Sequence, residues 1–269
     1  MRQKLVGTFL GEQLLLLRSW RQLRGIPFGN PEKASAIANG ILADRLIAAL
    51  PDDSSRFLDI GAHIGSVLSA VHRKNKSVSV FAIEAEKDKA QSLISRFPYC
   101  TVLNFAVGEQ DGVVTLHIFE RSGYNTIVQE TKGSSRSEQQ VELRMLDTLF
   151  PEETFETIKI DIEGAELGAL RGGANLIRRS RPIIMFESVG TGENSLGYSS
   201  AKMFKWLEEN EFEIVCPDRL AHNAPSMTLS AFEDAHAYPQ RAHNFFAVPI
   251  EKRSQVRDKA RQILGVRAS

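Results

Sequence analysis

The feature that most limits what this chain can fold into is a short apolar run at residues 56–60 that turns sharply into a helical pattern. Gly61 and Gly65 flank the turn, and the apolar residues that follow recur at helical spacing. Glycine lets a backbone bend tightly and lets a ligand approach with no side chain in the way. A helix N-terminus at the same place offers N–H groups to a ligand carboxylate or phosphate. The stretch therefore predicts a buried strand, a tight turn over a ligand, and a helix.

Strands and helices alternate from this point onward. After the first strand, at 56–61, further strands are predicted at 77–85, 100–107, 157–164, 182–189, 212–216 and 244–249. Helices are predicted at 65–74, 87–97, 166–179 and 200–210, the third of them interrupted at Gly172-Gly173. Strands that are apolar on both faces and alternate with helices indicate a parallel sheet with right-handed crossovers. We therefore predict an α/β fold.

The middle and the ends of the chain depart from this alternation. Residues 112–120 and 139–145 alternate apolar and polar side chains, as half-exposed strands do. We interpret 112–145 as an antiparallel insertion at the sheet edge, and 217–241 as a long loop. The expected organisation is an N-terminal helical segment at 1–50 that covers or packs on the core, a main domain at 51–250, and a basic C-terminal helix within 251–269.

Composition excludes several classes of protein. Lys+Arg and Asp+Glu both total 33, so no basic field indicates a nucleic-acid partner. Cys100 and Cys216 lie far apart, which favours reduced thiols over a disulfide framework or a zinc site. No apolar run approaches the roughly 18 residues that span a bilayer, so a cytoplasmic location is expected. The basic helix expected at 1–25 can make weak contact with a membrane surface, although packing over the core is the interpretation that we favour.

Polar side chains end most of the predicted parallel strands. In an open α/β sheet, ligands bind at the carboxyl ends of the strands. Glu84 ends the second strand, 19 residues after Gly65, where an acid can accept hydrogen bonds from both ribose hydroxyls of a nucleoside. The full set of polar strand ends is Asp59, Glu84, Asn104, Asp161 with Glu163, and Glu187.

The first turn distinguishes between two kinds of nucleoside cofactor. Dinucleotide-binding proteins usually carry G-x-G-x-x-G to accommodate a pyrophosphate. Residues 61–65 instead form G-x-x-x-G, and Asp59 precedes them by two residues. An acid at this place suits a cationic ligand such as a sulfonium and would repel a pyrophosphate. The turn therefore favours S-adenosylmethionine over a nicotinamide dinucleotide.

Four sequence blocks then resemble one family. They are Asp59-Ile60-Gly61-Ala62-His63-Ile64-Gly65, Asn104-Phe105-Ala106-Val107-Gly108, Ile158-Lys159-Ile160-Asp161-Ile162-Glu163-Gly164-Ala165-Glu166 and Ile183-Ile184-Met185-Phe186-Glu187. In order and spacing they resemble the FkbM family of S-adenosylmethionine-dependent methyltransferases. The resemblance covers roughly 55–190, with a weaker echo at 243–249. His63 departs from the asparagine that is more usual in the family.

The resemblance implies a fold and an activity. The fold is α/β, a Rossmann-like class I methyltransferase fold, with a mostly parallel sheet, an antiparallel edge strand, N-terminal helices and a β insertion. The main domain at 51–250 would be the methyltransferase domain. The activity implied is methylation of a hydroxyl oxygen on a sugar, a glycan or another small metabolite.

The cofactor is expected to contact the first three strand ends. We expect Glu84 to hold the ribose, Asn104 and Ala106 to line the adenine pocket, and Asp59 to orient the turn or to meet the methionine amino group. The cofactor-binding residues expected are Asp59, Gly61, Ala62, His63, Ile64, Gly65, Glu84, Asn104 and Ala106.

Catalysis is assigned to Asp161, Glu163 and Glu187. Methyl transfer to an alcohol requires loss of the hydroxyl proton, and adjacent carboxylates can raise one pKa toward that role. The same carboxylates can hold a divalent metal, although no metal ligand set is predicted. Alternatively, Asp161 contacts the methionine end of the cofactor and Glu163 caps the next helix. Glu166 is expected to interact with the dipole of that helix, and His243 is a weaker candidate base.

Two other functions stay open from the sequence. One is an NAD(P)-dependent oxidoreductase, which the turn at residues 61–65 disfavours. The other is a non-catalytic binding protein that keeps the Rossmann-like fold.

Overall fold

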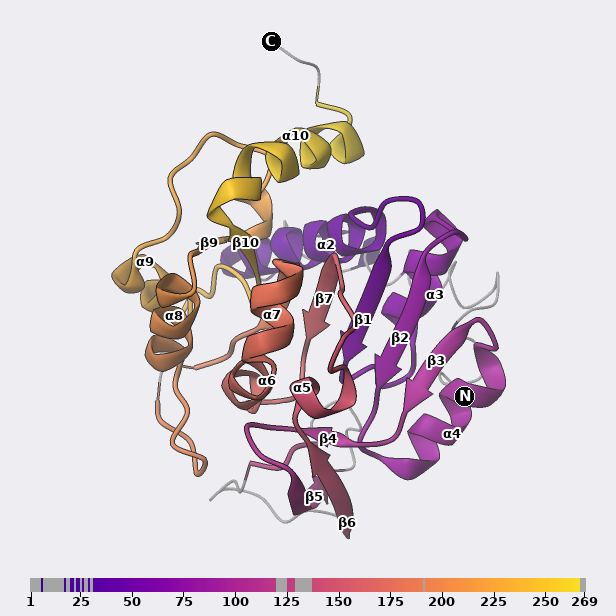
Figure 1. Ribbon diagram of the computed structural model, residues 1–269. Helices are drawn as coiled ribbons and strands as arrows, with labels where there is room; N and C mark the ends of the chain where they lie inside the picture. The colour runs from indigo at the N-terminus through magenta and orange to yellow at the C-terminus, as the bar shows by residue number, and fades with distance from the viewer. Residues whose placement is uncertain are drawn as a thin grey trace.

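A seven-stranded sheet forms the centre of the molecule (Figure 1). The computed structural model describes residues 31–119, 125–128, 137–190 and 192–266, together with residues 6, 17, 20, 21, 23, 24, 26 and 29. The strand order is β3-β2-β1-β7-β8-β10-β9. Their bounds are β1 Arg56–Ile60, β2 Ser79–Ile83, β3 Cys100–Leu103, β7 Thr157–Ile160, β8 Ile183–Glu187, β9 Phe212–Val215 and β10 Asn244–Pro249. The pairs β1–β2, β2–β3, β1–β7 and β7–β8 are parallel, as the alternation of strands and helices predicts.

The expected antiparallel strand is β10. It pairs antiparallel to both β8 and β9, so it lies one place inside the edge of the sheet and β9 forms the edge. The strand order with this single reversed strand is that of a Rossmann-like class I methyltransferase fold, which confirms the predicted fold class.

Helices cover both faces of the sheet because successive side chains of each strand point to opposite faces. Leu58 packs into the core that is shared with α5 to α8, whereas Phe57 packs into the core that is shared with α2, α3, α4 and α10. The helix bounds are α2 Ala34–Ala49, α3 Ser66–Lys74, α4 Lys87–Arg96, α5 Leu146–Leu149, α6 Glu166–Gly172, α7 Ala174–Ser180, α8 Ser200–Glu209, α9 Leu229–Asp234 and α10 Arg253–Leu264. Short 3-10 turns lie at Pro31–Lys33, Pro217–Arg219 and Ile250–Lys252.

The third predicted strand is divided in two. The structure ends β3 at Leu103 and begins β4 (Ala106–Val107) after a break at Asn104. The Asn104 side-chain amide donates to the carbonyl oxygens of Glu84 and Ala85, at 2.8 and 3.0 Å. A side chain thus replaces the strand pairing at this point, and the backbone leaves the main sheet.

The insertion forms a sheet of its own. The strands β5 (Gly112–Ile118) and β6 (Ser137–Arg144) pair antiparallel, as predicted, and β4 pairs parallel with β6. The resulting order β4-β6-β5 is separate from the seven-stranded sheet, so the insertion does not extend the edge of that sheet. Figure 1 places this small sheet beyond the arrowheads of β1, β2, β3 and β7, with α10 at the opposite end.

The segments 217–241 and 1–25 need separate comment, because the first differs from expectation and most of the second lies outside the described residues. The expected loop at 217–241 contains α9, whose N-cap Thr228 accepts a hydrogen bond from the Ala231 amide. A capping threonine followed by the buried Phe232 is a helix signal that the sequence does carry. Most of the helix expected at 1–25 lies outside the described residues, although Leu17 and Trp20 are helical. Within the described part of the chain, every helix is too short or too polar to cross a membrane.

Candidate active site

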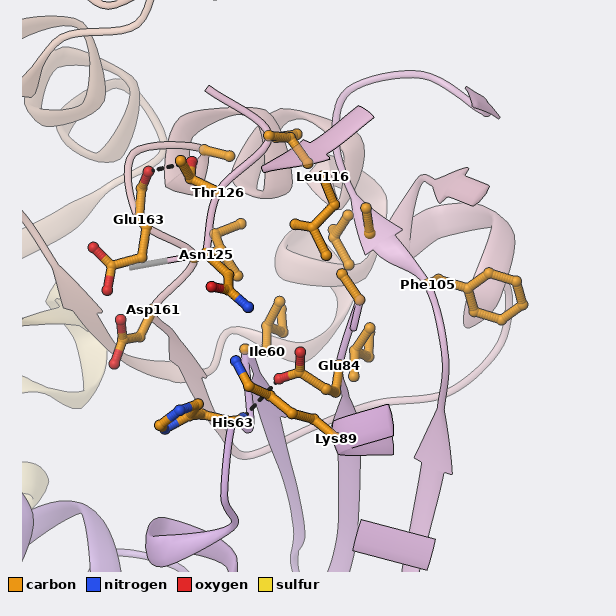
Figure 2. A pocket seen from close by; sticks show the side chains of 18 of the residues that line it. Ile60, His63, Glu84, Lys89, Phe105, Leu116, Asn125, Thr126, Asp161 and Glu163 are labelled. Carbon is orange, nitrogen blue, oxygen red and sulfur yellow. Dashed lines mark hydrogen bonds between the residues drawn. The ribbon is translucent and has the colours of Figure 1, made fainter. Parts of the chain in front are cut away.

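A cavity of about 190 Å³ opens at the carboxyl ends of the parallel strands (Figure 2). Its walls come from the first turn, the ends of β2 and β7, the β4 segment and the stretch 125–127 of the insertion. The lining residues are Ile60, Gly61, His63, Ile83, Glu84, Ala85, Lys89, Phe105, Ala106, Val107, Leu116, Asn125, Thr126, Ile127, Asp161, Ile162, Glu163, Ala165 and Glu187.

Both glycines of the first turn are required by close packing. Gly61 has φ +79°, and a Cβ there would lie 1.9 Å from the carbonyl oxygen of Asp161. Gly65 has φ +78°, and a Cβ there would lie 2.3 Å from the Phe97 ring. The amides of Gly61 and Ala62 donate to the carbonyl oxygen of Ile83, at 2.9 and 3.1 Å. The turn is thereby fixed against the ends of both neighbouring strands.

Glu84 connects the turn after β1 with the turn after β2. Its Oε2 accepts from the backbone N–H of His63 at 2.7 Å (Figure 2). Its Oε1 accepts from the backbone N–H of Glu86 at 3.0 Å. Burial raises the pKa of Glu84, and these two hydrogen bonds and the Lys89 charge oppose that rise. The carboxylate is therefore held in one orientation at the cavity wall.

Lys159 is a buried cation that sequence reasoning missed. Its Nζ lies 3.1 Å from Oδ1 of Asp59 and 3.2 Å from Oδ2 of Asp161. Asp59 and Lys159 are directly paired residues of β1 and β7, and they share one face of the sheet. A lysine inside an apolar strand is a signal that the sequence carries, because a buried charge requires a partner. The charge of Asp59, taken above as free to attract a cationic ligand, is thus already paired within the protein.

Asp161, Glu163 and Glu187 bring carboxyl oxygens to within 4.8 Å of one another. The strand β7 ends at Ile160, earlier than the predicted 164, so Glu163 reaches this cluster from a loop residue with φ +53°. Burial, followed by the charges of Asp161 and Glu163, raises the pKa of Glu187 to about 9. The Glu187 carboxyl therefore keeps its proton at neutral pH.

Glu166 shapes the loop that carries this cluster. Its Oε1 accepts from the backbone N–H groups of Ile162 and Gly164, at 3.0 and 3.2 Å. Burial raises the pKa of Glu166 to about 7. Besides its expected place in the first helical turn, Glu166 thus holds the loop between Asp161 and α6.

Residues 125–128 form a strap across the cavity. At one end Asn125 Nδ2 donates to Glu86 Oε2 at 2.6 Å, and that carboxylate also pairs with Lys89 at 2.8 Å. At the next residue, Thr126 Oγ1 donates to the carbonyl oxygen of Glu163 at 2.7 Å (Figure 2). The strap thus connects the Glu86 side of the cavity with the Glu163 side. The sequence did not single out these four residues, because they carry no recognisable motif.

The predicted site residues divide into two groups. Those that line the cavity are Gly61, His63, Glu84, Ala106, Asp161, Glu163 and Glu187. Asp59, Ala62, Ile64, Gly65 and Asn104 are not among the lining residues, and their roles toward a cofactor stay predictions. Burial and the nearby Lys89 charge lower the pKa of His63 to about 4, so its imidazole is neutral at pH 7. His243 is absent from the lining, and its carbonyl oxygen accepts from the Ser188 amide.

The fold and the turn are those of the class I methyltransferases, and a comparison with protein-family models identifies the family. The model of the FkbM methyltransferase domain matches residues 59–214, which is more than half of the chain. The chain belongs to this family, as its sequence blocks predict. No curated protein matches the sequence.

Solved structures resemble this fold at low sequence identity. The methyltransferase FkbM of Methylobacillus flagellatus KT is 18% identical with a TM-score of 0.46, over 72% of this chain and 43% of that one. Thus the match spans less than half of that protein. Fibrillarin of Aeropyrum pernix, with natively bound S-adenosyl-L-methionine, is 14% identical with a TM-score of 0.40, over 77% and 76% of the two chains. The precorrin-6y C5,15-methyltransferase of Geobacter metallireducens GS-15 is 14% identical with a TM-score of 0.40, over 65% and 73%.

Proposed function

We propose that this protein binds S-adenosylmethionine and transfers its methyl group to a hydroxyl oxygen of a sugar, a glycan or a small metabolite. One observation carries the proposal: Glu84 and the Asp161–Glu163–Glu187 cluster line the same cavity, on different walls. Glu84 is suited to bind a ribose, and the cluster is suited to accept a hydroxyl proton. Both would face a cofactor bound in this cavity.

The residues around Glu84 fit an adenosyl group. Each Glu84 oxygen accepts one backbone N–H, and a carboxylate oxygen can accept a second hydrogen bond, which leaves capacity for both ribose hydroxyls. Ile83, Ala106 and Leu116 give the neighbouring wall an apolar surface against which a purine can pack. When bound, S-adenosylmethionine supplies an electrophilic methyl group on a sulfonium.

The carboxylate cluster fits removal of the acceptor proton. Glu187 keeps its proton at neutral pH and lies in the same cluster, so Asp161 and Glu163 are the carboxyl groups that remain to accept a proton. In this proposal one of them takes the hydroxyl proton as the methyl group transfers. A positioned base contributes about 10²–10⁴-fold to a rate, and the alignment of the two reactants contributes the rest.

Calorimetric titration tests the choice of cofactor. We expect S-adenosylhomocysteine to bind, and NAD⁺ and NADP⁺ to give no heat at the same concentrations. Tight dinucleotide binding without S-adenosylhomocysteine binding would instead support the oxidoreductase. A protein that binds S-adenosylhomocysteine but methylates nothing in a panel of neutral sugars, glycans and metabolite extracts would be the non-catalytic binding protein.

The variant Asp161→Asn tests the base. We expect kcat to fall by about 10²–10⁴-fold with little change in S-adenosylhomocysteine affinity. Glu193→Gln is the control, since Glu193 makes an exposed ion pair with Lys202 away from the cavity. Loss of affinity without a fall in kcat would assign Asp161 to the methionine end of the cofactor. Dialysis against EDTA removes divalent metal ions. Activity that survives dialysis indicates that a carboxylate acts directly as the base, and activity that is lost indicates a metal-assisted reaction.

A further inference from the structure

Lys159 is a charged residue in the buried strand β7, between two isoleucines. Its neighbours Ile158 and Ile160 are fully buried, and the Lys159 side chain itself is only 7% exposed. Burial acts to lower the pKa of Lys159, but Asp161 and Asp59 outweigh that effect and raise it well above its usual range. The ammonium group therefore stays charged inside the protein.

Three points of the chain meet at this ammonium. Besides Asp59 and Asp161, it donates to the carbonyl oxygen of Gly61 at 3.4 Å. Asp59 is 1% exposed and is not among the lining residues, whereas Asp161 is 33% exposed and faces the cavity. Lys159 does not line the cavity itself.

We propose that Lys159 is a positioning residue that holds the first turn and the Asp161 carboxylate in one fixed arrangement. The inference rests on the function proposed above. Its basis is geometric, because Gly61 and Asp161 both line the cavity while the ammonium that joins them does not. Asp59 anchors the ammonium at the far side, so that its position is set by β1 as well as by β7.

The surrounding contacts show why this anchor is needed. The carbonyl oxygen of Asp161 is so close to Gly61 that a Cβ at Gly61 would lie 1.9 Å from it. The turn and the end of β7 are thus in direct backbone contact, and a shift in one moves the other. A mobile Asp161 carboxylate would also lose alignment with the acceptor, which is costly in reactions that depend on orientation.

The test compares three variants with the wild type. Lys159→Met removes the ammonium and keeps an apolar side chain of similar length. Removal of one partner from a buried ion pair often destabilises a protein, whereas replacement of both partners is tolerated better. The double variant Asp59→Asn/Lys159→Met therefore secures a folded protein that still lacks the anchor. Arg253→Met is the control, because Arg253 holds the carbonyl oxygens of residues 219, 220 and 222 far from the turn.

Two measurements are made on each variant: hydrogen exchange of the free protein, and calorimetric affinity for S-adenosylhomocysteine. We expect both Lys159 variants to exchange faster over 59–65 and 160–164 and to lose affinity by about ten- to a hundredfold. We expect Arg253→Met to change neither, even if it unfolds more easily. Unchanged exchange at the turn together with an affinity within twofold of the wild type would overturn the proposal.

The exchange measurement also separates this inference from the proposed function. If the wild type does not bind S-adenosylhomocysteine, the proposed function fails. Faster exchange over 59–65 in the Lys159 variants would still support the positioning role, and unchanged exchange would overturn it.

Discussion

Glu84 holds two backbone amides in place while it faces the cavity. Its carboxylate therefore has a structural task in the turns as well as a proposed task toward the ribose. We expect Glu84→Ala to weaken S-adenosylhomocysteine binding by about 1–3 kcal/mol, because buried donors lose their acceptor. Calorimetry measures the change.

The conservative variant separates the two tasks of Glu84. In Glu84→Gln the amide keeps the size of the side chain and one acceptor oxygen, so we expect a smaller loss of affinity than in Glu84→Ala. Equal affinity in the wild type and in Glu84→Ala would contradict the ribose role.

At the scale of single residues, the sequence predicted which residues lie at the cavity better than it predicted which side chains contact one another. It predicted polar strand ends, and seven of the twelve residues assigned to the site do line the cavity. It did not predict that Lys159 pairs with Asp59, because that contact depends on the register between two strands that lie far apart in the chain. Nor did it predict that Asn104 would end a strand through its own side chain.

The strap at 125–128 is the element that connects the two sides of the cavity. Its threonine hydroxyl donates to the Glu163 carbonyl oxygen and accepts from the Val128 amide at 3.0 Å. We expect Thr126→Val to lower the free energy of unfolding by about 1–3 kcal/mol, since both backbone groups lose their hydrogen bond to the hydroxyl. Hydrogen exchange should rise over 162–165, where the strap is attached.

Thr115 in β5 supplies the control for Thr126→Val. Its Oγ1 accepts a hydrogen bond from Gln140 at an exposed position of the small sheet. Thr115→Val should leave exchange over 162–165 unchanged. A similar effect of both substitutions would mean that the strap does not hold Glu163.

Close packing of α6 against β4 sets a second test at the scale of elements. A Cβ at Gly172 would lie 1.9 Å from the carbonyl oxygen of Gly108, whereas a Cβ at Gly40 in α2 would meet nothing within 4 Å. We expect Gly172→Ala to destabilise the protein by about 1–3 kcal/mol or more. Gly40→Ala should stabilise it by about 0.5–1 kcal/mol, because alanine loses less conformational freedom in a helix.

Urea unfolding measures the change in the free energy of unfolding for both glycine variants. We expect a decrease for Gly172→Ala and an increase for Gly40→Ala, although both substitutions add the same methyl group. A tolerated alanine at Gly172 would show that α6 can move away from β4 at little cost.

The elements of the main domain and its parallel sheet followed from the sequence pattern, whereas the place of the insertion did not. Apolar runs and turn glycines predicted the strands and helices of the main sheet, because each signal lies within one segment. Whether 112–145 joins the main sheet or forms its own depends on the break at Asn104, which acts across β2 and β3. The helix α9 was missed because a six-residue helix gives only a weak periodic signal.

For the molecule as a whole, buried carboxyl groups predict how stability depends on pH. Glu187 has a folded pKa of about 9, against an ordinary value of 4.5. Between these values the folded state keeps a proton that the unfolded state has lost, so stability falls as pH rises. Glu166, with a pKa of about 7, acts in the same direction over the lower part of this range.

The variant Glu187→Gln isolates this effect, because glutamine does not titrate. We expect its free energy of unfolding to rise relative to the wild type between pH 6 and pH 9, as measured by urea unfolding at several pH values. Glu193→Gln, at an exposed ion pair, should keep a constant difference from the wild type. If the curves for Glu187→Gln and the wild type run parallel, the Glu187 carboxyl titrates in its ordinary range.

The separate small sheet has a consequence for how proteins of this architecture can diversify. The small sheet and the adjoining segment contribute Leu116 and residues 125–127 to the cavity. Among the residues that the structure describes, no strand of the small sheet pairs with the seven-stranded sheet. Substitutions in the hairpin can therefore reshape one wall of the cavity while the pairing of the main strands stays as it is. In evolutionary time, or in a library of variants, the shape of this wall can therefore drift while the turn at residues 61–65 is inherited intact.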